Sequence, residues 1–391
     1  MKFLGIDIGT TSICGVVLDA TNGRMESVTM ENNSWIRSKR DWERIQDPNK
    51  IIGIARKVLS ELLEKHGKDV GGIGVTGQMH GIIYTSVSGK AVGPLYTWQD
   101  GRGNLPQGRN ERTYAEELSR KTGYAVAPGF GLVTHWYNRK RGLVPRDAHK
   151  LCTISDYVVM QLAQRLEPLM DPTNAASLGV YDLRRNCFDT RALGKAGINA
   201  NILPDVGRAE SLAGHYCGIP VYTALGDNQA SFLGSVRDIE NTLLVNIGTG
   251  GQISGYMKHF SAVGGLDVRP FPGGGYLLVG ALLCGGKAYS LLENFFRSAA
   301  EFFSLPEGKV DFYARMNAIN YMDLTEKLGV DTRFAGTRRD PAIRGTIAGI
   351  SMNNFTPEHL IAGFLDGITK ELYDFYLKMP AAVRRNVRSV A

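Results

Sequence analysis

"FLGIDIGTTSICG", residues 3–15, is the most informative part of this chain for its fold. Apolar residues alternate on both sides of a Gly-Thr-Thr sequence, which predicts a hairpin of two strands over 3–8 and 12–19. The first strand ends on a carboxylate and the turn carries small and hydroxyl residues: Asp7, then Gly9, Thr10 and Thr11. Turns of this kind present backbone N–H groups and hydroxyls that can bind phosphate.

A second stretch, "LLVNIGTGGQISG" at residues 243–255, repeats this pattern 239 residues later, with Asn246 in the place of Asp7. Its turn is formed by Gly248, Thr249 and Gly250. A single Gly-Thr turn often has no role beyond reversing the chain. Two matched copies favour a split phosphate clamp, in which each turn contributes half of a phosphate-binding site. The repeat predicts two domains, residues 1–236 and 237–391, with the turns lining a cleft between them.

The composition is that of an ordinary globular chain, with 391 residues, 43% hydrophobic and 21% charged. The net charge of +7 is spread out, and its basic runs lack the interleaved aromatic residues of a nucleic-acid surface. The five cysteines are scattered, without a CxxC pair, and the seven histidines show no metal-ligand spacing. No apolar run is long enough for a membrane span and the N-terminus does not resemble a signal peptide, so we expect a cytoplasmic protein.

Several familiar motifs are excluded by their context. "GIGVTG", residues 72–77, matches the dinucleotide fingerprint, but a predicted helix precedes it and a loop follows it, the reverse of what that site requires. Lys287 in "CGGKAYS" is followed by Ala, so there is no Walker A sequence. No G-x-S-x-G elbow of a serine hydrolase occurs.

Two polar clusters follow predicted strands and resemble a sugar site. "GQMHG" contributes Gln78, Met79 and His80, and "TWQDGR" contributes Trp98, Asp100 and Arg102. A lone histidine in a loop is usually structural, but here Trp98 offers a flat apolar surface, and Asp100 and Arg102 offer directional polar groups. A polyol needs both, because it has C–H faces and hydroxyls that require partners.

Asp227 in "LGDNQAS" lies between a strand and a helix predicted to start near Gln229. An aspartate there can cap the helix, or it can act as a base toward a hydroxyl. The residues alone leave these alternatives open.

Taken together, "GIDIGTTS", "GVTGQMHG", "TWQDGR", "LGDNQAS", "VNIGTGGQ" and "FAGTRRDPAIRGTIAGI" resemble the FGGY carbohydrate kinases over nearly the whole chain. The resemblance implies an α/β protein with the two-domain actin/Hsp70/hexokinase-like (ribonuclease H-like) fold, with duplicated mixed sheets, flanking helices and a central cleft. Within the family, "GFGLVTHWYNRK", "SDYVV" and "TNAASLGVYD" are more similar to sedoheptulokinase than to xylulokinase.

The resemblance also implies ATP-dependent phosphorylation of the terminal hydroxyl of a sedoheptulose-like or xylulose-like ketose. Asp227 would be the general base, and Asp7 would organise Mg²⁺. The ATP phosphates would be held by Gly9, Thr10, Thr11, Gly248, Thr249 and Gly250. The sugar would be bound by Gln78, Met79, His80, Trp98, Asp100, Arg102, Asn174 and Asn228. The alternative is a non-catalytic sugar-binding or regulatory protein on the same fold, and a homodimer is left open.

The sequence departs from the family pattern at two places. Val133 or Thr134 stands where many members carry a lysine, and the chain stops at "RRNVRSVA", before the family's Gly-rich adenine-binding loop. The sequence therefore predicts a C-terminal domain that is truncated before this loop, weak ATP binding and retained ketose binding.

Overall fold

The computed structural model describes residues 1–108, 112–208, 210–304, 310–321, 323–337, 340 and 342–391. The chain divides into two compact units. Unit 1 comprises Met1–Ser231 with Arg269–Gly275, and unit 2 comprises Phe232–Val268 with Tyr276–Ala391. Helix α7 (Asp227–Ser235) runs through the point of division, so the boundary expected after residue 236 and the roles of the two domains stay predictions.

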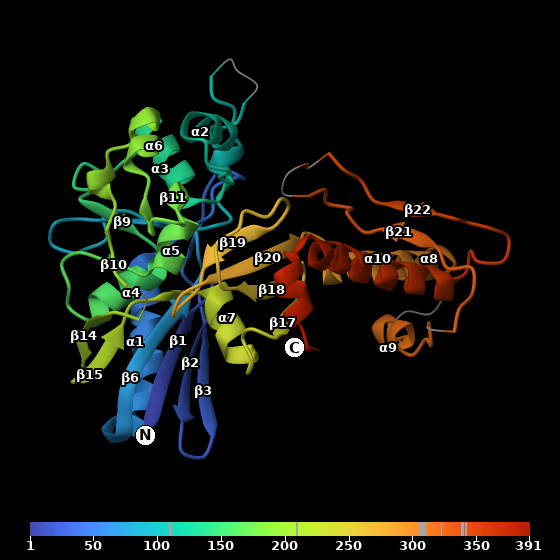
Figure 1. The fold of residues 1–391 in the computed structure, drawn as a ribbon, viewed down its shortest axis with the longest axis horizontal. Helices are drawn as coiled ribbons and strands as arrows, with labels where there is room; N and C mark the ends of the chain where they lie inside the picture. The colour runs from blue at the N-terminus through green and yellow to red at the C-terminus, as the bar shows by residue number, and fades with distance from the viewer. Residues whose placement is uncertain (109–111, 209, 305–309, 322, 338–339, 341) are drawn as a thin grey trace. The chain divides into compact units, whose positions relative to one another are not determined.

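The main sheet of unit 1 has the strand order β14-β15-β6-β1-β2-β3, with β16 also paired to β6 (Figure 1). The predicted hairpin is present: β1 and β2 are antiparallel, with Asp7 opposite Cys14 and Ile8 opposite Ile13. On its other side β1 runs parallel to β6. The strands are β1 (Lys2–Ile8), β2 (Ser12–Asp19), β3 (Met25–Glu31), β6 (Val70–Gly77), β14 (Leu212–Tyr216), β15 (Ile219–Tyr222) and β16 (Leu225–Gly226).

Helix α1 (Pro48–His66) packs on this sheet, as its apolar periodicity predicts. Asp47 caps its first turn, and its buried face includes Val58 and Leu62. Gly15 on β2 permits the close approach, because a Cβ there would lie 2.5 Å from Val58 and 2.6 Å from Leu62. The buried helix face and the sheet therefore share one apolar core.

The rest of unit 1 consists of short helices and strands. Its helices are η1 (Gly67–Asp69), η2 (Gly101–Asn104), α2 (Tyr114–Thr122), α3 (Gly131–Lys140), α4 (Ile154–Leu162), α5 (Pro172–Ser177), α6 (Thr190–Ala196) and η3 (Ala200–Ile202). Its short strands are β4 (Trp35–Ile36), β5 (Ile45–Gln46), β7 (Ile83–Thr85), β8 (Leu95–Tyr96), β9 (Lys150–Cys152), β10 (Leu169–Met170), β11 (Tyr181–Asp182), β12 (Cys187–Phe188) and β13 (Asp205–Val206).

One helix start differs from the sequence-based expectation. Serine is a favoured N-cap residue, so "SDYVV" by itself predicts a cap at Ser155, but Thr153 is the capping residue of α4. The reason is that Asp156, three residues after Thr153, completes a reciprocal capping box with it.

Unit 2 repeats the sheet-and-helix arrangement in the order β19-β20-β18-β17-β23. The second predicted hairpin is β17 with β18, antiparallel, with Ile247 opposite Gly251. Helix α10 packs on this sheet, and Gly280 allows Phe375 to approach, since a Cβ at Gly280 would lie 2.4 Å from its ring. The elements are β17 (Thr242–Ile247), β18 (Gly251–Met257), β19 (Asp267–Pro270), β20 (Tyr276–Leu282), β21 (Gly329–Asp331), β22 (Thr346–Ala348), β23 (Ser389–Val390), α8 (Gly286–Phe302), α9 (Phe312–Asn317), α10 (Pro357–Lys378) and α11 (Ala381–Asn386). Of the helices within the described residues, none combines the length and the apolar character that crossing a membrane requires.

Candidate active site

Two carboxylates stand at the same end of the unit 1 sheet. Thr76 on β6 pairs with Asp7 of β1 on one side and with Leu225 of β16 on the other. The Thr76 hydroxyl also donates to the Leu225 carbonyl over 3.0 Å. Asp227 begins α7 directly after β16, so the central strand β6 sets the positions of both carboxylates.

The pKa values of both carboxyl groups are raised. For Asp7, desolvation by the surrounding protein is the larger cause, and repulsion from Asp227 adds to it. For Asp227, burial raises the pKa, while the hydrogen bond from Asn228 and the charge of Arg269 act in the opposite direction. A carboxylate with a raised pKa is a stronger base, and a pair that repels itself would be stabilised by a cation.

Buried polar groups support the strand that leads to Asp227. The Thr173 hydroxyl accepts a hydrogen bond from the backbone N–H of Gly226 over 3.0 Å. Asn174 is fully buried, and its Nδ2 donates to the Ala224 carbonyl over 3.1 Å and to Asp156 over 3.2 Å. Its Oδ1 has no partner within the described residues. Asn174 therefore supports the segment that leads into β16, and its predicted contact with sugar stays a prediction.

The first predicted phosphate turn is bonded to side chains from two other segments. Asn32 Nδ2 donates to the Gly9 carbonyl over 2.8 Å, and its backbone N–H donates to the Thr11 carbonyl over 2.9 Å. Gln46 Nε2 donates to the Thr10 carbonyl over 2.9 Å. Asn32 and Gln46 are not among the predicted site residues, because an amide at the end of a short strand or just after a strand forms no recognisable motif.

The structure brings two predicted sugar residues to this same turn. The Trp98 indole N–H donates to the Thr10 hydroxyl over 3.1 Å, and that hydroxyl donates to Gln78 Oε1 over 3.4 Å. Trp98 is nevertheless 47% exposed, whereas Gln78 is buried. An exposed indole held at one edge leaves its ring face available to a ligand.

Met79 and His80 directly follow Gln78 in the chain. His80 has a left-handed backbone with φ 71°, and its ring stacks on Phe130 with centroids 4.6 Å apart. Its Nδ1 donates to the Ser177 carbonyl over 2.7 Å, which fixes the ring. Asn228 Nδ2 lies 3.9 Å from the Met79 sulfur and 2.6 Å from Asp227 Oδ1. The structure therefore brings Met79 and Asn228 together beside Asp227.

Asp100 and Arg102 form a buried ion pair, and each is 1% exposed. Arg102 Nε donates to Asp100 Oδ1 over 2.6 Å, its other nitrogens donate to Asn138 and Glu43, and its guanidinium lies 4.2 Å from the Tyr96 ring centroid. Protein groups thus surround the guanidinium. This arrangement supports a role in positioning the Trp98 segment, and the predicted contact with sugar stays a prediction.

The second predicted phosphate turn, in unit 2, is bonded to the start of α8. The N–H groups of Gly286 and Lys287 donate to the carbonyls of Gly248 and Thr249 over 2.7 and 2.9 Å. A Cβ at Gly285 would lie 2.2 Å from the Gly250 carbonyl oxygen. The glycines of "CGGK" therefore permit this contact, a role that the sequence analysis did not assign.

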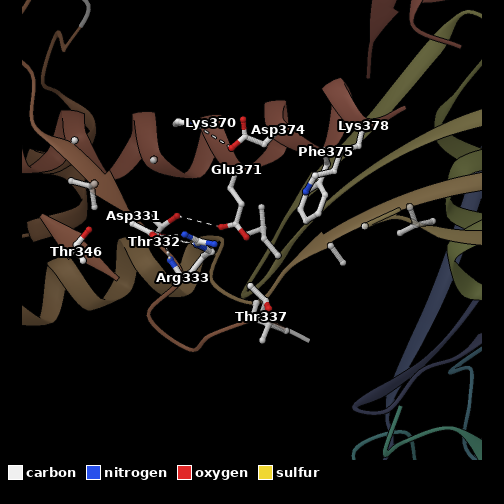
Figure 2. A pocket seen from close by; sticks show the side chains of 18 of the residues that line it. Asp331, Thr332, Arg333, Thr337, Thr346, Lys370, Glu371, Asp374, Phe375 and Lys378 are labelled. Atoms are coloured by element: carbon white, nitrogen blue, oxygen red, sulfur yellow. Dashed lines mark hydrogen bonds and ion pairs between the residues drawn. The ribbon is translucent and has the colours of Figure 1, made fainter. Parts of the chain in front are cut away.

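A cavity of about 540 Å³ lies elsewhere in unit 2, along one face of α10 (Figure 2). Its charged side chains mostly pair with one another: Arg333 with Asp331 over 2.6 Å, and Lys370 with Asp374 over 3.0 Å. None of the predicted site residues lines it.

Comparisons with known proteins identify the family of this chain. Residues 2–234 match the model of the FGGY family of carbohydrate kinases, N-terminal domain. Sedoheptulokinase of Mus musculus is 27% identical over 410 residues, spanning 95% of this chain and 84% of that protein. Glycerol kinase of Vibrio vulnificus is 26% identical over 401 residues, spanning 97% of this chain and 77% of that protein.

The solved structures agree on the fold. Xylulose kinase from Rhodospirillum rubrum superposes with a TM-score of 0.82 at 21% identity, covering 96% of this chain and 78% of that one. Plasmodium falciparum glycerol kinase with ADP superposes with a TM-score of 0.76 at 16% identity, covering 100% of this chain and 81% of that one. The fold is thus the two-domain actin-like, ribonuclease H-like fold of sugar kinases, as predicted. The chain belongs to the FGGY family of carbohydrate kinases. It is therefore a phosphotransferase that uses ATP as a substrate, and this finding favours catalysis over the non-catalytic alternative.

Proposed function

We propose that this kinase transfers the γ-phosphoryl group of ATP to the terminal hydroxyl of a ketose, either sedoheptulose-like or xylulose-like. The observation that carries the proposal is the pair Asp7 and Asp227 at one end of the unit 1 sheet, each with a raised pKa. The similarity to sedoheptulokinase supports a ketose as the acceptor.

In this proposal Asp227 is the general base. Phosphoryl transfer depends mainly on positioning and charge, with a carboxylate that orients the attacking hydroxyl and accepts its proton. Burial keeps the basicity of Asp227 high, and the hydrogen bond from Asn228 orients its carboxylate. Binding of the sugar is assigned to the exposed Trp98 face, to His80 and to Asn228, with Gln78, Met79, Asp100, Arg102 and Asn174 contacting it or positioning those that do.

Asp7 is proposed to hold Mg²⁺ together with the ATP phosphates. Within the described residues there is no group of three or more His, Cys, Asp or Glu side chains that could hold a metal. Mg²⁺ does not need such a cage, because it usually binds one or two carboxylates, substrate phosphates and several waters. A bound Mg²⁺ would neutralise charge on the phosphates and offset the repulsion between Asp7 and Asp227.

The phosphates are assigned to the two turns. In unit 1 these are Gly9, Thr10 and Thr11, and in unit 2 they are Gly248, Thr249 and Gly250 at the start of α8. Gly9 suits such a turn, because a Cβ there would lie 2.7 Å from the Ser12 carbonyl oxygen.

The test is an ADP-release assay with the full chain, Mg²⁺ and ATP, across sedoheptulose, xylulose, other ketoses, glycerol and an acceptor-free blank. We expect turnover with a ketose well above both glycerol and the blank. Preference for glycerol, as the similarity to glycerol kinase would allow, contradicts the ketose assignment.

A further inference from the structure

Gln46 closes a ring of hydrogen bonds between the first phosphate turn and the sugar side of the site. The Thr10 hydroxyl donates to Gln78 Oε1 over 3.4 Å, and Gln78 Nε2 donates to Gln46 Oε1 over 3.0 Å. Gln46 Nε2 then donates back to the Thr10 carbonyl over 2.9 Å. Gln46 has no exposed surface, so it can touch neither substrate directly.

The direction of this ring is determined by one group. The Thr10 carbonyl can only accept, so the nitrogen of the Gln46 amide must face it and the oxygen must face Gln78. Gln78 must then present its nitrogen to Gln46, which leaves its oxygen for the Thr10 hydroxyl. Trp98 joins the ring from outside, because its indole N–H donates to that hydroxyl over 3.1 Å.

We propose that Gln46 is a positioning residue that couples ketose binding at Gln78 and Trp98 to ATP binding at the Thr10 turn. The proposal rests on the proposed function, which places sugar on one side of this ring and phosphate on the other. A ligand that orders Gln78 also orders Thr10, because Gln78 is bonded directly to the Thr10 hydroxyl and, through Gln46, to the Thr10 carbonyl. A ligand that orders Trp98 acts on the same hydroxyl. The second substrate then binds to a turn that is already ordered.

The coupling is measured as the factor by which one ligand tightens the other. Calorimetry with the full chain would give the dissociation constants of xylulose and sedoheptulose with and without a non-hydrolysable ATP analogue and Mg²⁺. Coupling between sites typically amounts to a factor of about 5–150. In Gln46→Met, which keeps the length of the side chain and loses both hydrogen bonds, we expect this factor to fall, because only the direct contacts of the Thr10 hydroxyl with Gln78 and Trp98 then remain.

Gln161 provides a matched control. Its Nε2 donates to the Gly89 carbonyl over 2.7 Å, so Gln161→Met removes a similar bond in the same unit without touching the ring. We expect Gln161→Met to keep the coupling of the wild type. Equal loss of coupling in both variants would show a general loss of stability and would overturn the proposal.

Gln46→Glu supplies a readout that a merely structural role would not produce. A protonated carboxyl can donate to the Thr10 carbonyl, whereas the ionised form would repel it. Burial raises the pKa of a carboxyl, so coupling in this variant, relative to the wild type, should recover as the pH falls. This variant also keeps the proposal testable if Gln46→Met does not fold.

These outcomes distinguish a failure of the role of Gln46 from a failure of the proposed substrate class. If Gln46→Met kept the wild-type coupling factor, or if the coupling factor of Gln46→Glu relative to the wild type did not change with pH, the role of Gln46 alone would be overturned. A wild-type chain that binds neither ketose would overturn the proposed substrate class, and this inference with it.

Discussion

Replacement of Asp227 by asparagine tests the proposed base most directly. Asparagine keeps the shape of the side chain and the acceptor that Asn228 Nδ2 contacts over 2.6 Å, so little in α7 should move. What is lost is the ability to accept a proton from the sugar hydroxyl. The predicted result is a large fall in kcat with a small change in the KM for ketose.

The magnitude follows from the task of the carboxylate. General-base catalysis typically contributes about 10²–10⁴-fold, and each tenfold corresponds to about 1.4 kcal/mol of activation free energy. We therefore expect kcat to fall by about 10²–10⁴-fold, which is about 3–5 kcal/mol. Binding changes less, because the residues proposed to bind the sugar are not altered.

A second effect concerns Asp7. Its pKa is raised partly by repulsion from Asp227, so a neutral residue at position 227 lowers the pKa of Asp7. In the wild type, activity is expected to fall as the pH drops through the raised pKa values of both groups. In Asp227→Asn, the residual activity should persist to lower pH.

The assay is initial-rate ADP release over a pH series, with Asp47→Asn as the control. Asp47 caps α1 in the same unit, and asparagine caps helices equally well, so this variant should behave as the wild type does. A kcat near the wild-type value in Asp227→Asn would refute the base assignment and leave Asp227 a structural role at the start of α7.

Four further predictions concern single residues. Trp98→Ala should weaken ketose binding by at least the stacking contribution of about 0.5–1.5 kcal/mol, and Trp98→Phe should retain most of it, as calorimetry would show. Arg102→Met should lower the free energy of unfolding by about 3–5 kcal/mol by leaving a buried carboxylate unpaired; an unchanged denaturation midpoint would contradict this. Gly285→Ala should raise the KM for ATP and spare ketose affinity, because its Cβ would lie 2.2 Å from the Gly250 carbonyl oxygen. Burial raises the pKa of Asp156 from 3.8 to about 7. The folded state therefore retains a proton that the unfolded chain loses, and the free energy of unfolding should decrease as the pH rises across that interval, a slope that Asp156→Asn should remove.

The elements that could be predicted from the sequence are those whose signals are local. Both hairpins and α1 were predicted because strand alternation, turn residues and helix periodicity are each complete within a short stretch. The pairing of Ile8 with Ile13 follows from the turn that joins their strands. The family resemblance could be seen for the same reason, since each of its motifs is contiguous.

Contacts between residues far apart in the chain became visible only in the folded structure. Gln46 lies 36 residues from Thr10 and 32 from Gln78, and no local pattern marks a buried amide as a bridge between them. Likewise, no local pattern shows that Asp100, Asn138 and Glu43 surround Arg102, whose predicted contact with sugar stays a prediction. Burial and hydrogen-bond partners depend on which segments pack together, and that packing is a property of the whole folded unit, which no single stretch of sequence contains.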